Sequence, residues 1–150
     1  YTDASKSDIG ATGASFFVPA YGIERSFRFS TVISVSTAEL LAVKLALEYM
    51  QTTLILRNIK QLVVLTDSLS TGNTSMYDNK ITDTLEIVRN LQKQNIDVKF
   101  VWIPSHCNIE GNERADELAK AATGRKIADV IIIPQATDFC NNIENYINNK

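Results

Sequence analysis

Four acidic residues occupy positions, in or beside predicted strands and on the apolar sides of helices, where an acidic side chain is uncommon. Glu39 lies near the start of a predicted helix and, at about 100° per residue, points away from the polar stripe toward the core. Asp67 follows a continuous apolar run after one threonine, and Asp3 lies in the opening strand. Asp116 lies at the edge of the apolar arc of a later helix. Taken singly, each has an ordinary explanation as a helix cap, a terminal polar residue or a solvated surface acid.

A shared site would give these acids one chemistry. Carboxylates that are pushed together repel one another and resist ionisation, and divalent cations remove that objection. Mg²⁺ takes oxygen ligands from a few carboxylates and completes its octahedron with water and substrate phosphate. Two such ions about 3.5–4 Å apart can activate a water and stabilise the leaving oxygen of a phosphodiester. We therefore expect two Mg²⁺ ions, with Mn²⁺ as a substitute, at the edge of a sheet where the acids converge.

The first half of the chain contains the elements that would position Asp3, Glu39 and Asp67. Two alternating runs, 14–18 and 27–30, flank a Pro-Ala-Tyr-Gly turn signal and predict an antiparallel hairpin. Ser36 is the predicted N-cap of a helix that runs to about residue 51. The apolar run 62–65 predicts a strand buried on both faces, in a sheet with parallel pairs.

The second half repeats the alternation of helix and strand. An amphipathic helix is predicted over 81–94, after a polar segment 68–79 that has room for a short helix, and a strand over 96–102 that places Trp102 in the core. A helix over 111–123 ends at Gly124. The tail from Ile127 has the pattern of a short strand and a final helix. The order is βββ-α-β-α-β-α, which indicates a mixed sheet with helices packed on it.

Composition limits the class of protein. The 150 residues are 45% hydrophobic and 21% charged, as expected for one soluble globular domain over 1–150. Fifteen basic and 17 acidic residues give a net charge of -2, which argues against a general nucleic-acid binder. Cys107 and Cys140 are interpreted as reduced thiols, so we expect an intracellular location. Neither a signal peptide nor an apolar run of membrane-spanning length is found, so no membrane association is expected.

The motifs around the four acids occur in the order of the ribonuclease H (type 1) family, which the chain resembles over about 1–123. The acids are separated by 36, 28 and 49 residues. The longest and most specific block runs from Trp102 to Lys120. The likeness is greatest to the ribonuclease H domains of non-LTR retrotransposon polyproteins, and it leaves 124–150 as a C-terminal extension. The matching segments are Thr2-Asp3-Ala4-Ser5, Thr37-Ala38-Glu39-Leu40, Thr66-Asp67-Ser68, Trp102-Ile103-Pro104-Ser105-His106 and Gly111-Asn112-Glu113-Arg114-Ala115-Asp116-Glu117-Leu118-Ala119.

This resemblance implies an α/β ribonuclease H-like fold, a five-stranded mixed sheet with its first three strands antiparallel and helices on both faces. It implies endonucleolytic cleavage of the RNA strand of RNA–DNA hybrids, in a domain tethered to a reverse transcriptase. It also implies that His106 assists proton transfer or product release. His106 is the only histidine and lies in a predicted loop, which suits that role. The metal-binding carboxylates implied are Asp3, Glu39, Asp67 and Asp116.

Polar side chains next to the acids are candidates for substrate contact. A hybrid displays 2′-hydroxyls in a wide, shallow minor groove that short polar groups can read without base specificity. The candidates are Ser5, Ser36, Ser68 and Asn112. The cellular bacterial enzymes carry a basic helical protrusion before the strand that bears Trp102; here residues 81–94 contain only Arg89 and Lys93 as basic residues, so the protrusion is predicted to be absent.

Two alternatives stay open at this level. The domain could be a catalytically silent module that holds nucleic acid or a partner, or a related two-metal nuclease with another substrate. Four acids at partly buried positions argue against a silent module, because they would cost stability without metal. Two divalent ions would take the net charge from -2 to +2, which is still weakly basic, so binding should rely on metals, local contacts and a tethered partner.

Overall fold

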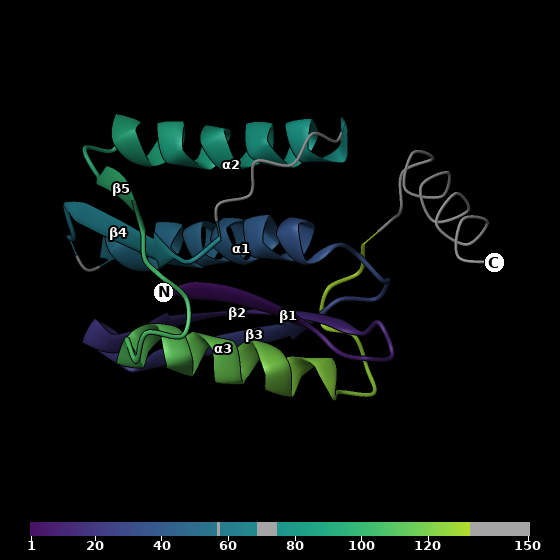
Figure 1. Ribbon diagram of the computed structural model, residues 1–150. Helices are drawn as coiled ribbons and strands as arrows, with labels where there is room; N and C mark the ends of the chain where they lie inside the picture. The colour runs from purple at the N-terminus through teal and green to yellow at the C-terminus, as the bar shows by residue number, and fades with distance from the viewer. Residues whose placement is uncertain (57, 69–74, 133–150) are drawn as a thin grey trace.

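The computed structural model describes residues 1–56, 58–68 and 75–132 and contains a five-stranded sheet at its centre (Figure 1). The strand order is β3-β2-β1-β4-β5. β1 pairs antiparallel with β2, and β2 with β3, whereas β4 lies parallel to both β1 and β5. The predicted mixed sheet, with its first three strands antiparallel, is confirmed. The strands are β1 (Thr2–Lys6), β2 (Thr12–Val18), β3 (Ile23–Arg28), β4 (Gln61–Thr66) and β5 (Asp97–Trp102).

The predicted hairpin is β2–β3, which turns through a 3-10 helix, η1 (Pro19–Tyr21). Gly22 closes this turn at φ 60° and donates its N–H to the Pro19 carbonyl. A left-handed residue is needed here to reverse the chain, and glycine adopts that conformation without a steric penalty. Val18 and Ile23 then pair as the first residues of the hairpin ladder.

The helices cover both faces of the sheet, as predicted. Figure 1 shows α1 (Val35–Leu56) and α2 (Ser75–Lys93) on one side, with α3 (Glu110–Thr123) on the other. One cluster of buried residues joins α1 to α2 and β4 through Leu47, Val64 and Leu91. A second cluster joins α1 to β1 and β2, with Ala4, Ala14 and Leu41 among its buried members. These two clusters fix α1 against β1, β2 and β4, the middle strands of the sheet.

Helix α1 starts at Val35, two residues before the start that a cap at Ser36 would give. The Ser34 hydroxyl accepts the Thr37 N–H at 3.1 Å and contacts the Thr37 hydroxyl at 2.8 Å. Ser34 is therefore the N-cap, and the prediction that Ser36 caps the helix is wrong. Because Ser34 takes over the capping role, Ser36 and Glu39 are left available for the site described below.

Helix α3 packs unusually close to the sheet. Ala115, Ala119 and Ala122 are fully buried beneath it, and Gly13 of β2 faces them. A Cβ atom at Gly13 would lie 2.6 Å from the Ala119 carbonyl oxygen. The Ser15 hydroxyl donates to the Ala115 carbonyl at 2.5 Å. These small residues fix the depth at which α3 lies against β2.

The β4–β5 side of the sheet is less covered than predicted. Trp102 is 51% exposed and Val63 40% exposed, so the predictions of a core tryptophan and of a β4 strand buried on both faces are wrong. The physical reason is that α3 packs on β1, β2 and β3 and not on this side of the sheet.

The connection between α2 and β5 is short. α2 starts at Ser75, six residues before its predicted start, and only three residues separate its end from β5. No helical protrusion interrupts that connection.

After α3, the described chain returns to the sheet. Val130 forms a parallel bridge with Phe29, and its carbonyl accepts the Ser30 N–H at 3.0 Å. This contact agrees with the short strand predicted in the tail, whereas the predicted final helix lies outside the described residues. None of the helices in the described ranges is long and apolar enough to cross a membrane.

Candidate active site

The four acids meet in one open pocket of about 300 Å³. Asp3 comes from β1, Glu39 from the first turns of α1, Asp67 from the end of β4, and Asp116 from α3. His106 reaches the same pocket from the loop between β5 and α3. The predicted convergence is therefore present in the structure. The lining residues are Asp3, Ala4, Val35, Ser36, Glu39, Asp67, Ser68, Ser105, His106 and Asp116.

Asp3 and Glu39 form the buried floor of the pocket. Their residues are only 6% and 7% exposed. The backbone N–H of Ala4 donates to one Glu39 oxygen at 3.2 Å. The other Glu39 oxygen, Oε2, is buried and has no hydrogen-bond partner among the described residues. A buried carboxylate oxygen without a partner is costly unless a ligand satisfies it.

Burial makes both groups reluctant to ionise. Desolvation, reinforced by the charges of Asp3 and Asp67, raises the pKa of Glu39 to about 9. Desolvation and the charge of Asp67 raise the pKa of Asp3 to about 7. A cation placed between these carboxylates would reverse the effect, because an opposite charge favours the ionised form.

Asp67 is held by contacts from two other elements. The Trp102 indole N–H donates to the Asp67 carbonyl at 3.1 Å, and the Asn112 amide donates to its carboxylate Oδ2 at the same distance. Asn112 is buried, at 3% exposed. Its amide oxygen has no partner among the described residues. Asn112 therefore orients Asp67 from beneath the pocket.

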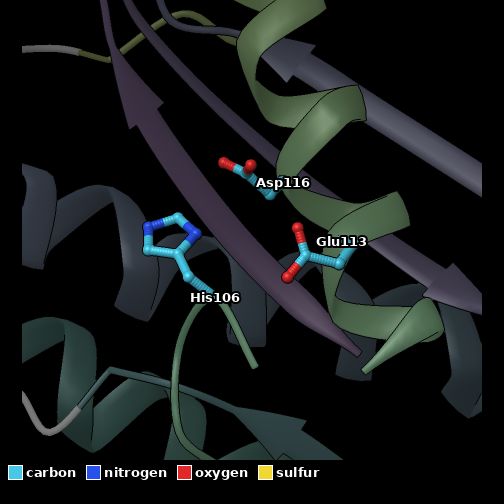
Figure 2. A group of neighbouring side chains, drawn as sticks. All are labelled: His106, Glu113 and Asp116. Carbon is cyan, nitrogen blue, oxygen red and sulfur yellow. The ribbon is translucent and has the colours of Figure 1, made fainter. Parts of the chain in front are cut away.

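The opposite wall is formed by α3 and the loop ahead of it. Figure 2 shows the side chains of Glu113 and Asp116 leaving α3 on the side of the loop that carries His106. These three residues offer ligand atoms that lie within 4.8 Å of one another. Asp116 also accepts a short hydrogen bond of 2.5 Å from Lys120, and this carboxylate raises the pKa of the lysine.

Glu113 is the residue that sequence reasoning missed. It lies inside the most specific motif but was given no role. The signal was available, since positions three apart on a helix share a face, and Glu113 and Asp116 have that spacing. His106 and Asn108 adopt φ values of 53° and 57°. These left-handed residues bend the loop so that the imidazole faces the α3 carboxylates (Figure 2).

The donor set fits a hard divalent cation. Asp3, Glu39 and Asp67 each offer a carboxylate oxygen, and these oxygens lie within 4.8 Å of one another. All three are oxygen donors, as Mg²⁺ and Mn²⁺ prefer. Among the described residues, no hydrogen-bond donor faces Oε2 of Glu39, so this oxygen is available to bind a cation. The cluster can thus hold one ion directly, with the Asp116–Glu113–His106 group on the opposite wall.

Of the four residues predicted to contact substrate, the fold places two at the pocket. Ser36 and Ser68 line the pocket beside the acids, and Ser105 joins them without having been predicted. Ser5 is not among the lining residues, and Asn112 is occupied with Asp67. Contact of any of the four with substrate stays a prediction.

The geometry corresponds to a known family. Residues 1–124 match the RNase H family, and the chain belongs to it. No curated protein sequence is significantly similar to the chain.

Solved structures confirm the fold. LC11-RNase H1 in complex with an RNA/DNA hybrid is 23% identical, with a TM-score of 0.65 over 82% of this chain and 94% of that one. RNase H1 from the halophilic archaeon Halobacterium salinarum NRC-1 is 21% identical, with a TM-score of 0.53 over 81% and 93%. The N-terminal RNase H domain of Rv2228c from Mycobacterium tuberculosis, solved as a fusion with maltose-binding protein, is 13% identical, with a TM-score of 0.53 over 81% and 91%.

Proposed function

We propose that this domain is a metal-dependent endoribonuclease that hydrolyses the RNA strand of RNA–DNA hybrids. The observation that carries the proposal is the convergence of Asp3, Glu39, Asp67 and Asp116 in one pocket of an RNase H family chain. The hybrid bound to LC11-RNase H1, a structure of the same fold, supports this class of substrate.

Each group in the pocket has a task in this chemistry. Asp3, Glu39 and Asp67 would hold a divalent ion, and Asp116 would contribute to a second. Bound divalent ions activate water and stabilise the leaving oxygen of a phosphodiester. Asn112 and Trp102 keep Asp67 in place by their hydrogen bonds.

His106 is suited to proton movement. It is exposed and lines the pocket, so it can pass a proton between the site and solvent. Its ring nitrogen lies within 4.8 Å of the Glu113 and Asp116 carboxylates, which can orient it. Ser36 and Ser68 on the pocket wall offer hydroxyls to the 2′-hydroxyls of the RNA strand.

The decisive experiment compares three labelled substrates: the hybrid, single-stranded RNA and duplex DNA, each with Mg²⁺ and with EDTA. We expect cleavage of the RNA strand of the hybrid alone, and only with metal. Hybrid cleavage that survives EDTA would contradict the two-metal mechanism, and equal cleavage of all three substrates would contradict the hybrid specificity. Absence of cleavage with intact hybrid binding would instead identify a silent module.

Two variants sharpen the assignment of roles. Glu39→Gln keeps the shape of the side chain but removes a carboxylate oxygen, so turnover should be lost while the thermal transition is retained. His106→Ala should slow turnover less than Glu39→Gln, because it removes a proton carrier and leaves the metal site intact. If Glu39→Gln unfolds the protein, or if both variants lose equal activity, these roles are wrong.

We also propose that the domain acts within an intracellular retroelement polyprotein, tethered to a reverse transcriptase. The support is the motif pattern together with the weak net charge of -2, which leaves substrate capture to a partner. The sequence encoded upstream of Tyr1 tests this context directly. An upstream region without a polymerase domain would contradict it.

A further inference from the structure

Arg114 of α3 forms a two-pronged ion pair with Glu24 of β3. Its Nε atom donates to Oε1 of Glu24 at 2.7 Å, and its Nη2 atom donates to Oε2 at 2.8 Å. The remaining nitrogen, Nη1, donates to Glu117 at 2.9 Å. The hydrogen bonds from Arg114 lower the pKa of Glu24, so the pair stays charged near neutral pH. A planar fork of this kind fixes direction as well as distance.

This ion pair lies on the surface and outside the acidic pocket. The side chains of Arg114 and Glu24 are 43% and 36% exposed, and neither residue lines the pocket. Exposed ion pairs contribute little to folding stability, because water and salt screen them and the side chains lose freedom. Removal of the pair should therefore leave the fold intact, so that any effect on the site can be measured separately.

Arg114 and Asp116 lie on opposite flanks of α3. They precede and follow Ala115, which is fully buried against the sheet. At about 100° per residue, their side chains project to either side of the buried line of the helix. One flank carries Arg114 to β3, and the other carries Glu113 and Asp116 toward the loop of His106 (Figure 2).

The buried line between these flanks is made of small residues. Alanines at 115, 119 and 122 lie there, and Gly13 of β2 is in close contact with the last two. Small side chains allow a close approach, but they have no branches that interlock with the sheet and oppose rotation of the helix about its axis. The Ser15 hydroxyl bonds to the Ala115 carbonyl on this same line, where it acts as a pivot.

Contacts on the two flanks must then set the angle of the helix. Asn112, on the pocket flank, donates to Asp67 of the β4 end. Arg114, on the other flank, is held by Glu24 of β3. The two contacts act on opposite sides of the buried line, so loss of either one lets α3 turn toward the other.

We propose that the Arg114–Glu24 pair sets the angle of α3 about its axis and so holds Asp116 in place for a second metal ion. Arg114 is thus a positioning residue that acts through Asp116. This inference rests on the proposed function, because it concerns the same site. The effect should fall on the ion that involves Asp116 and spare the ion that the other three acids would hold.

The test compares Arg114→Gln, Glu24→Gln and the double variant with the parent. Arg125→Gln is the matched control, because Arg125 is an exposed arginine that joins the segment after α3 to Ser26 of β3. In EDTA, Tm of each variant should stay within about 4 °C of the parent, since an exposed ion pair contributes little to stability.

Calorimetric titration with Mn²⁺, without substrate, separates metal binding from activity. In Arg114→Gln and Glu24→Gln we expect the weaker of two binding steps to lose about 10-fold in affinity, as for other residues that orient metal ligands, and the tighter step to be unchanged. The double variant should lose no more than either single variant, because the two residues act as one pair. Arg125→Gln should bind both ions like the parent.

The side-chain amide of Asn112 gives a second readout that needs no metal. Rotation of α3 should weaken its bond to Asp67, so its amide protons should exchange with solvent faster by on the order of threefold or more in Arg114→Gln. Unchanged exchange, or an equal change in Arg125→Gln, would overturn the positioning role. An unchanged weaker step in a protein that binds two ions would also overturn it.

The two readouts separate this inference from the proposed function. If the parent binds fewer than two Mn²⁺ ions while the Asn112 amide responds as expected, the two-metal mechanism is contradicted and the control of α3 by Arg114 is upheld.

Discussion

Asp3 shows how a single residue can serve the site at the expense of the fold. Its carboxyl is buried beside other acids, and its pKa rises to about 7. A group with a raised pKa in the folded state favours folding below its unfolded value, near 3.8, and that contribution is lost as pH rises through about 7. Glu39, with a pKa of about 9, extends the loss to higher pH. Without metal, the protein should therefore lose stability between pH 4 and 9.

Replacing Asp3 by Asn tests this reading. In EDTA at pH 8, Asp3→Asn should raise Tm by about 5 °C, on the order of 2 kcal/mol, because the buried charge is removed. At pH 4 the variant and the parent should agree closely, since the parent is then protonated. The measurement is thermal unfolding by circular dichroism across this pH range. Mg²⁺ should stabilise the parent at pH 8 more than the variant, and identical metal responses would contradict a metal role for Asp3.

Asn112 is a residue that positions Asp67, and its hydrogen bond to Asp67 can be tested separately. Asn112→Ala removes the donor at 3.1 Å and leaves the carboxylate free to turn. We expect the Mg²⁺ concentration for half-maximal activity to rise by about 10- to 100-fold, as for other residues that orient metal ligands. Gln92→Ala, an exposed change on α2, is the matched control. A lower kcat with unchanged metal dependence would contradict the positioning role.

At the scale of elements, α3 determines where the fourth acid lies. Gly13 of β2 lets the helix approach, since a Cβ there would lie 2.6 Å from the Ala119 carbonyl oxygen. Gly13→Ala must therefore displace backbone, at a cost of about 1–3 kcal/mol. It should also lower kcat, because Asp116 moves with the helix. Thermal unfolding and hybrid cleavage measure the two effects.

Gly22→Ala is the comparison. Its Cβ would meet nothing within 4 Å, so its cost comes only from the φ of 60°. That cost is about 1 kcal/mol, and kcat should be unchanged because the β2–β3 turn is remote from the pocket. Equal effects of the two changes on kcat would show that α3 depth does not control the site.

Sequence reasoning succeeded where a local pattern decides the structure. The alternation of apolar residues identified the β2–β3 hairpin, and helical periodicity placed Glu39 on the core side, as its 7% exposure confirms. It failed where neighbouring elements decide. Trp102 has the pattern of a core residue, but it lies on an edge strand that α3 does not cover. Ser36 has the spacing of a cap, but Ser34 satisfies the helix start first.

The site was predictable to a similar degree. The order of the four acids indicated a common site, and the fold brings them together. The burial of Asn112 and the reach of Glu113 toward His106 depend on how α3 meets the β5 loop, which no local pattern records.

At the scale of the whole molecule, charge sets how substrate is held. The net charge of -2 would become +2 with two divalent ions, and Lys120 is already paired with Asp116 of the pocket. Among the described residues, the pocket lining contains neither lysine nor arginine. Long-range attraction should be weak, so the metals and short-range contacts should contribute most of the binding.

The salt dependence of cleavage measures this balance. Affinity falls with salt in proportion to the number of phosphates neutralised, and two or three such contacts predict a loss of about 10- to 40-fold in kcat/KM between 50 and 200 mM KCl at constant Mg²⁺. A surface with six to ten phosphate contacts would lose about a thousandfold or more over the same range. The shallow dependence is expected here, because the four acids dominate the charge at the pocket. If fusion to a hybrid-binding partner domain then lowers KM while kcat stays constant, substrate capture is supplied by the partner through effective concentration. A steep salt dependence in the isolated domain would instead show that a basic contact surface extends beyond the pocket.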